Sequence, residues 1–180
     1  VLVHAAAGGV GSILVPWLKG LGATVIAHAG SAAKAEIAVT LGADHALSCP
    51  LDELAGEVRV LTGGLGVKTV LDGVGAASWK ASLASVARRG LLVTYGNASG
   101  PVPPFVPTEL MAAGSIFVTR PTLADYTVTE TELRASAARL FDMIGSGSVP
   151  VRIGTRFALA DVAEAHRALE SRATTGSTLL

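Results

Sequence analysis

The sequence predicts an α/β protein built on a doubly wound, six-stranded parallel sheet. Short runs of apolar and β-branched residues alternate with helix-like segments along the first 120 residues, and glycine-containing turns separate them. Parallel neighbours in a sheet need crossover connections, which right-handed helical crossovers supply. The composition agrees, because 50% hydrophobic residues, 4% aromatic residues and 21 glycines suit helices packed closely on both faces of such a sheet.

The alternation assigns the elements in order. The expected strands cover residues 1–5, 24–29, 45–49, 67–71, 91–95 and 115–119. The expected helices cover residues 13–21, 32–41, 52–61, 76–89 and 109–113. Gly42 and Gly63-Gly64 follow two of these helices where a helix end favours glycine. The helix over 76–89 is expected to end in Arg88-Arg89-Gly90, with basic charge at the negative end of the helix dipole before a glycine stop.

Pro16 lies in the middle of the first expected helix. It has no N–H to donate to the Ser12 carbonyl, and its ring crowds the preceding turn. We therefore expect a kink at Pro16 or a shifted first turn.

The pattern changes beyond residue 120, which predicts two parts, residues 1–120 and residues 121–180. The expected elements of the second part are a helix from the capping box Thr129-x-x-Glu132 to Gly145, an extended run over 149–159, a helix opened by Asp161-x-x-Glu164, and a strand over 177–180. The chain starts directly with a strand, without an initiator methionine, so we expect it to be an excised part of a longer protein.

Charge and composition argue against several classes of protein. Lys+Arg and Asp+Glu are both 14, so no net field favours nucleic acid or an anionic membrane. No apolar run approaches the roughly 20 residues that span a bilayer, so a soluble protein is expected. The single cysteine, Cys49, excludes an intramolecular disulfide and a Cys-clustered zinc site, and it fits a reducing cytoplasm. The four histidines are dispersed, so no metal site is expected.

The stretch after the first strand is a candidate dinucleotide-binding turn. Ala6-x-Gly8-x-x-Gly11 has the spacing of a sharp strand-to-helix turn whose backbone can approach a pyrophosphate, with Ala6 replacing the usual first glycine. The first N–H groups of the following helix would then face the two phosphates. Read alone, the same stretch is also compatible with an ordinary glycine-rich turn.

The end of the second strand indicates which dinucleotide the turn holds. NAD-binding proteins place Asp or Glu there to accept a hydrogen bond from the ribose 2′-hydroxyl. This chain has Gly30 and Ser31 instead, with Lys34 one turn later. Because a hydroxyl and an ammonium group favour a 2′-phosphate, the expected cofactor is NADPH.

The ends of three other strands complete the candidate site. Tyr95-Gly96-Asn97 ends the fifth strand, where a small residue and an amide suit the nicotinamide half of the cofactor. Cys49 ends the third strand beside the adenosine side, where we interpret it as a small spacer. Asp72 ends the fourth strand, where we expect it to fix a loop rather than to perform acid–base chemistry.

Five stretches together resemble the NADPH-dependent quinone oxidoreductases, the zeta-crystallin-like, zinc-free branch of the medium-chain dehydrogenase/reductase superfamily. They are VLVHAAAGGVG, GSAAKAE, LVTYGNASG, GSIFVTRPTL and LESRATTGSTLL. The resemblance implies a Rossmann domain over residues 1–120 and a return segment, residues 121–180, of a GroES-like catalytic domain. The N-terminal part of that catalytic domain is absent from this chain.

The resemblance also implies roles for individual residues. Gly8, Gly9, Val10 and Gly11 would meet the pyrophosphate, and Ala7 beside them would also belong to the cofactor site. Ser31 and Lys34 would hold the 2′-phosphate, and Tyr95 and Asn97 would lie along the nicotinamide side. Arg172 resembles a family arginine that reaches the cofactor from the end of the chain. Cys49 stands where family members often carry a tyrosine, which puts that contact in doubt. The sixth strand, from Ser115 through Ile116, Phe117 and Val118 to Thr119, would form the interface of a homodimer.

The activity implied is hydride transfer from NADPH to a quinone or another conjugated carbonyl, with no catalytic residue assigned in this chain. An NADPH-dependent enoyl reductase, free-standing or from a polyketide synthase, shares the fold and the AAGGVG turn. A non-catalytic dinucleotide-binding or crystallin-like protein is a third alternative.

Overall fold

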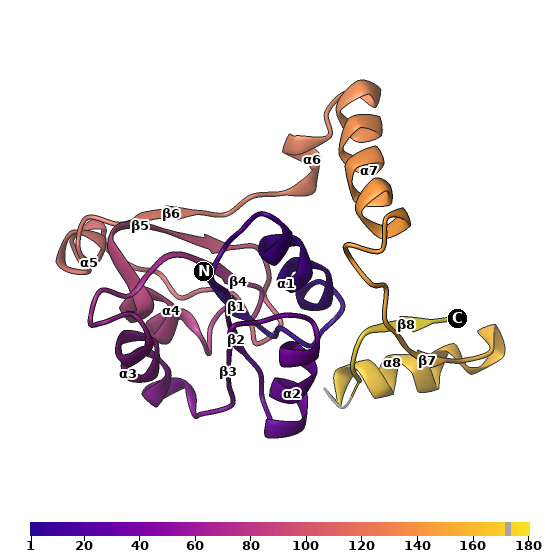
Figure 1. Cartoon of the computed structure of the whole chain (residues 1–180), viewed down its shortest axis with the longest axis horizontal. Helices are drawn as coiled ribbons and strands as arrows, with labels where there is room; N and C mark the ends of the chain where they lie inside the picture. Colours follow the sequence, from indigo (N-terminus) through magenta and orange to yellow (C-terminus); the bar gives the residue numbers. More distant parts are fainter. Residues whose placement is uncertain (172–173) are drawn as a thin grey trace.

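Six parallel strands form the central sheet, in the order β3-β2-β1-β4-β5-β6 (Figure 1). The computed structural model describes residues 1–171 and 174–180. The strands are β1 (Leu2–His4), β2 (Ile26–His28), β3 (His45–Leu47), β4 (Val67–Asp72), β5 (Val86–Thr94) and β6 (Phe117–Thr119). The order runs outward from β1 in both directions, which confirms the predicted doubly wound sheet and places a topological switch point between β1 and β4.

Helices cover both faces of this sheet and enclose two apolar cores. The helices that connect the strands are α1 (Gly11–Gly20), α2 (Ala32–Thr40), α3 (Leu51–Leu61), α4 (Trp79–Ser85) and α5 (Pro107–Ala112). Successive residues of a strand point to opposite faces, so Leu2 packs in one core with Leu54 of α3 and Trp79 of α4. Its neighbour Val3 packs in the other core with Val15 of α1. The burial of all three residues of β1 explains its continuous apolar sequence.

The predicted helix over 76–89 is wrong at its C-terminal end. Helix α4 stops at Ser85, and Arg88, Arg89 and Gly90 belong to β5. Val86, at the start of β5, is buried and pairs with Val67 of β4, so long-range pairing outweighs the local helical pattern. A Cβ on Gly90 would lie 2.9 Å from the Lys68 carbonyl oxygen, which gives this glycine a sheet-packing role rather than a helix-ending one.

Helix α1 begins earlier than predicted and continues through Pro16. The structure assigns one helix from Gly11 to Gly20 with Pro16 inside it. The Ser12 N–H donates to the Gly8 carbonyl at 2.8 Å, so helical hydrogen bonding starts within the glycine turn itself. The bend at Pro16 stays a prediction.

The last sixty residues form a separate group of elements that extends away from the sheet (Figure 1). They are α6 (Leu123–Tyr126), α7 (Glu130–Gly145), β7 (Ile153–Arg156), the short 3-10 helix η1 (Leu159–Asp161), α8 (Val162–Glu170) and β8 (Ser177–Leu179). Strands β7 and β8 pair in parallel as a small sheet of their own. The division at residue 120 stays a prediction.

One of the two predicted caps in this part is confirmed. Thr129 and Glu132 exchange hydrogen bonds at the start of α7, with the Thr129 N–H donating to Glu132 at 2.9 Å and the Glu132 N–H donating to the Thr129 hydroxyl at 3.2 Å. Asp161, by contrast, makes no side-chain cap at the start of α8. Its backbone (φ −100°, ψ 20°) continues the preceding turn of η1 and lacks the extended conformation that a capping side chain needs. Within the described ranges, no helix has both the length and the apolar character needed to cross a membrane.

Gly11 is the residue through which α1 packs against β1. A Cβ there would lie 2.6 Å from the Ala6 Cα, a separation that real side chains do not reach. Replacing Gly11 with alanine is therefore expected to lower the free energy of unfolding by roughly 2–3 kcal/mol, measured by urea denaturation.

Gly56 provides the matched control. It lies inside α3, and a Cβ there would meet nothing within 4 Å. Gly56→Ala should raise the free energy of unfolding by roughly 0.5–1 kcal/mol, because alanine is the better helix former. Equal effects of the two substitutions would contradict the close packing assigned to Gly11.

Candidate cofactor site

The glycine turn lies at the carboxyl end of β1, where α/β sheets bind their ligands. The Gly8 N–H donates to the Ala5 carbonyl at 2.9 Å, which closes the turn on itself. Val10 precedes α1 without a side-chain cap, and the first turn of the helix contains no acidic residue. The N–H groups of Ser12 and Ile13 already donate to the Gly8 and Val10 carbonyls, so what suits the start of α1 to an anion is the positive end of the helix dipole with no carboxylate in the first turn.

A cavity of about 850 Å³ opens beside this turn. Five predicted residues line it, namely Ala7, Gly8, Gly30, Lys34 and Cys49. Gly9, Val10, Gly11 and Ser31 are not among the described residues that line this cavity. The cavity also reaches residues that the sequence reasoning did not name, which are His4, Ala5, His28, Ala29, Ser48, Pro50, Leu51, Val74, Ala77, Ala98, Ser99, Leu169, Glu170 and Thr174. Many of these follow directly after strands, so inspecting every strand end would have found them.

Ser31 and Lys34 lie together at the start of α2. The Lys34 N–H donates to the Ser31 hydroxyl at 3.4 Å, so Ser31 caps the helix, and the first turn of α2 carries no acidic residue. Lys34 lines the cavity beside Gly30. This end of the cavity therefore combines a helix N-terminus with a cationic side chain, an arrangement that favours a phosphate.

The C-terminal segment contacts the glycine turn. The Gly176 N–H donates to the Ala7 carbonyl at 3.2 Å, and Gly176 forms an isolated parallel bridge with Gly8. Glu170 and Thr174 line the same cavity. Arg172, predicted to reach the cofactor, lies outside the described residues.

The end of β5 separates this first cavity from a second one. Ala98 and Ser99 line the first cavity, and Asn97 lines the second, which has a volume of about 690 Å³. Tyr95 and Gly96 line neither cavity among the residues the structure describes. A Cβ on Gly96 would lie 2.7 Å from the Gly73 Cα, so this glycine is required by packing between two strand ends. Burial and the charge of Asp72 raise the pKa of Tyr95.

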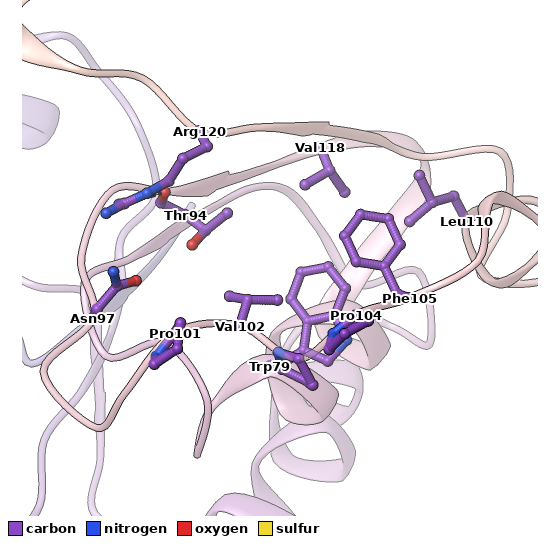
Figure 2. A pocket seen from close by; sticks show the side chains of 11 residues that line it. Trp79, Thr94, Asn97, Pro101, Val102, Pro104, Phe105, Leu110, Val118 and Arg120 are labelled. Carbon is purple, nitrogen blue, oxygen red and sulfur yellow. Dashed lines mark hydrogen bonds between the residues drawn. The ribbon is translucent and has the colours of Figure 1, made fainter.

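The second cavity has one aromatic end and one polar end (Figure 2). Trp79 and Phe105 pack with ring centroids 4.9 Å apart, and Val102 lies beside them. Arg120 lies at the other end and donates to the Thr94 carbonyl at 2.8 Å. The buried Thr94 hydroxyl has no hydrogen-bond partner in the described part of the chain. The cavity could therefore hold a flat apolar molecule that carries a polar group at one end.

Below the first cavity, Asp72 is the centre of a buried hydrogen-bond network. Its carboxylate is 1% exposed and accepts hydrogen bonds from the Val74 N–H (2.7 Å) and from the hydroxyls of Ser78 (2.7 Å) and Ser82 (2.6 Å). The Ser82 hydroxyl also lies 2.9 Å from Nε2 of His4. These contacts confirm that Asp72 fixes a loop, and they extend its contacts to the end of β1.

The two histidines of the site have pKa values that keep them neutral. Burial lowers the pKa of His4 to about 4, despite the opposing charge of Asp72. Burial also lowers the pKa of His28, although its Nε2 lies 3.0 Å from the Cys49 carbonyl oxygen. Burial raises the pKa of Asp72, but the charge of His4 and the hydrogen bonds of Ser82 and Ser78 reverse this, and the net pKa is lowered. Cys49 has a pKa raised mainly by burial, so it stays a thiol.

His4 predicts a pH dependence of stability. Its pKa is about 4 in the folded chain and 6.5 when exposed, so between these values the unfolded chain binds more protons and stability falls as pH falls. From about pH 7 to about pH 4.5, His4 should lower the free energy of unfolding by roughly 2–3 kcal/mol, measured by urea denaturation.

The variant His4→Gln should show a shallower slope over this range. The variant should keep a part of the slope, because the pKa of His28 is also lowered in the folded chain. Asp72 contributes at lower pH, since its lowered pKa lies below the ordinary value of 3.8. Identical slopes for the variant and the native chain would show that His4 does not titrate as described.

The arrangement of the potential metal ligands shows whether the described residues could bind a metal ion. Among residues 1–171 and 174–180, no three His, Cys, Asp or Glu side chains gather where they could hold a metal ion. The His, Cys, Asp and Glu side chains of the described residues therefore do not fit a zinc site, which usually has three or four protein ligands.

Comparison with known proteins agrees with this geometry. The chain is 45% identical over 181 residues to a quinone oxidoreductase of Salmonella typhimurium, covering 99% of this chain and 55% of the relative. A mycobacterial protein solved with NADPH superposes with a TM-score of 0.95 at 51% identity, over 99% of this chain and 56% of the other. The Escherichia coli quinone oxidoreductase, also solved with NADPH, gives a TM-score of 0.92 at 41% identity, over 99% and 56% of the two chains.

The chain thus spans about half the length of the curated relatives it matches. The family model for zinc-binding dehydrogenases matches residues 9–143. On this evidence, the chain belongs to the zinc-binding dehydrogenase family.

Proposed function

We propose that this chain is the cofactor-binding part of an enzyme that transfers a hydride from NADPH to a quinone or a related conjugated carbonyl. The observation that carries the proposal is the first cavity, which joins the glycine turn at Gly8 with Gly30 and Lys34 at the carboxyl ends of the strands. The relatives solved with NADPH support the choice of cofactor.

The proposed contacts fall into three groups along the cofactor. Lys34 and Ser31 would hold the 2′-phosphate beyond β2, and Cys49 would lie beside the adenosine at the end of β3. The turn from Ala7 to Gly11 would hold the pyrophosphate, since it stands at the switch point between β1 and β4. The nicotinamide half would then extend past β4 towards Asn97 at the end of β5.

The second cavity supports an acceptor that is flat and apolar. A bound NADPH supplies the hydride from its nicotinamide ring. Asn97, on the boundary between the two cavities, would orient that ring, and Trp79 and Phe105 would exclude water from the acceptor. Arg120 and Thr94 provide hydrogen-bond donors for a carbonyl oxygen whose negative charge grows during the transfer.

The C-terminal part supports a division into two domains, with residues 1–120 binding the cofactor and residues 121–180 completing a catalytic domain. Helix α7 has no buried residue along its described length. Leu133 and Phe141 of this helix are exposed by 51% and 66%. Such an apolar helix face needs a partner surface, which the remaining part of a catalytic domain would provide.

The exposed edge of the sheet supports a homodimer. Strand β6 is the outermost strand next to β5, and Phe117 within it is 62% exposed. An exposed apolar edge strand is suited to pairing with a second copy across a twofold axis.

The proposed enzyme would act in a reducing cytoplasm, where the single thiol of Cys49 remains reduced.

Lys34→Ala is expected to weaken NADPH binding by roughly 10- to 100-fold and to leave NADH binding within about twofold, because only NADPH carries the 2′-phosphate. Nicotinamide fluorescence in titrations with both cofactors measures this. Lys80→Ala, which removes an exposed lysine of α4, is the matched control and should change neither affinity. Equal affinity of the native chain for both cofactors would reject the assignment of NADPH.

The acceptor is tested by steady-state NADPH oxidation with the full-length protein. A series of simple quinones should be reduced with a kcat/KM at least about tenfold above that for enoyl thioesters, because the aromatic end of the second cavity suits a flat ring. A preference for enoyl thioesters would favour the enoyl reductase alternative. Binding of NADPH without oxidation by either class would favour a non-catalytic protein.

Phe117→Asp is expected to convert a dimer into a monomer in sedimentation experiments, because it places a charge in the proposed interface. Val60→Asp makes the same change at an exposed position of α3, where Val60 is 77% exposed, and should leave the dimer intact. A native protein that sediments as a monomer at micromolar concentration would refute the interface.

A further inference from the structure

The network around Asp72 connects two segments that both line the first cavity. On one side, Asp72 accepts hydrogen bonds from the Val74 N–H at 2.7 Å and from the Gly75 N–H at 3.3 Å. On the other side, Ser82 joins Asp72 to His4 of β1. Val74 and His4 both line the cavity, so one buried carboxylate holds two of its walls.

The direction of each hydrogen bond in this network follows from the donors available. The Ser82 hydroxyl has one hydrogen, which it donates to the carboxylate of Asp72 at 2.6 Å. His4 must then donate its Nε2 hydrogen to the Ser82 oxygen at 2.9 Å. The chain of bonds therefore fixes one tautomer of His4 and holds its ring, which is fully buried, in one orientation.

The position of the network in the sheet indicates which part of the ligand it serves. Lys34 and Cys49 follow β2 and β3, on one side of β1. Val74 and Ala77 follow β4, on the opposite side of β1. Because the cavity extends across β1, the wall formed by Val74 and Ala77 faces the half of the ligand that is remote from Lys34, while His4 lies between the two sides at the end of β1.

We propose that Asp72 is a positioning residue for the nicotinamide half of the cofactor, acting through the turn over residues 73–78 and, by way of Ser82, through His4. The inference rests on the proposed function, since it assumes that the first cavity binds a dinucleotide. It predicts that the two halves of that dinucleotide respond differently to a change in the network. A residue needed only for folding would affect both halves alike.

The test compares NADPH with adenosine 2′,5′-bisphosphate, which carries the adenosine and its 2′-phosphate but no nicotinamide. Asp72→Asn should weaken NADPH binding by roughly tenfold or more and leave the bisphosphate within about twofold. Ser82→Ala removes the hydroxyl that bonds both Asp72 and His4, while the bonds of Asp72 to Val74 and Ser78 remain, and it should weaken NADPH binding by roughly three- to tenfold. Calorimetry measures both affinities, and circular dichroism checks the fold of each variant.

Ser85→Ala is the matched control for Ser82→Ala. Ser85 lies on the same helix and is equally buried, but its hydroxyl donates to the Ala81 carbonyl of its own helix at 2.7 Å. It should leave both affinities unchanged. If Asp72→Asn does not fold, the comparison of Ser82→Ala with Ser85→Ala decides alone.

Two outcomes would overturn the inference while leaving the proposed function in place. One is NADPH affinity within about twofold of the native value in both network variants, and the other is an equal loss of affinity for NADPH and for the bisphosphate. If the native protein binds the bisphosphate and NADPH no better than inorganic phosphate, the proposed function itself fails, and this inference fails with it.

Discussion

The contact between Gly11 and the end of β1 is the constraint on which the rest of the site depends. With a side chain at this position, α1 could not lie against the backbone of Ala5 and Ala6. The close contact places the start of the helix at the carboxyl edge of the sheet, directly after the turn whose Ala7 and Gly8 line the cavity. Gly176 then reaches the same turn from the C-terminal part and donates to the Ala7 carbonyl. One missing Cβ thus sets the geometry of the glycine turn and of the start of α1.

The second organising feature is the buried charge of Asp72. A carboxylate removed from water is unfavourable unless hydrogen bonds replace its hydration. Here backbone N–H groups and two serine hydroxyls supply those bonds, and together with His4 they lower the pKa of the carboxyl group. The same bonds connect the ends of β1 and β4, the two strands that flank the switch point. The hydrogen bonds that stabilise the buried charge of Asp72 therefore also fix the shape of the cavity.

Much of the fold and part of the site could be predicted from the sequence, because the signals involved are local. The alternation of strands and helices, the turn around Gly8 and the capping box at Thr129 each depend on a few neighbouring residues. The C-terminal end of the helix over 76–89 was wrong because Arg88-Arg89-Gly90 has the local character of a helix end. Val86 and Leu91, on either side of these three residues, pair with Val67 and Thr69 of β4, about twenty positions away, and this pairing leaves no local trace. Five of the predicted cofactor residues line the first cavity, whereas Tyr95 and Gly96 serve the packing of strand ends.

The sequence by itself determined the parallel architecture, the position of the glycine turn after β1 and the absence of a carboxylate near Gly30, since glycine spacing and charge are readable in single segments. Only the tertiary structure decided that His4, Asp72 and Ser82 form one network, that Trp79 and Phe105 line one end of a second cavity, and that Gly176 meets Gly8. These contacts join residues that are far apart in the chain. They exist only because the sheet brings the ends of its strands to one edge, and no local pattern encodes which side chains meet there.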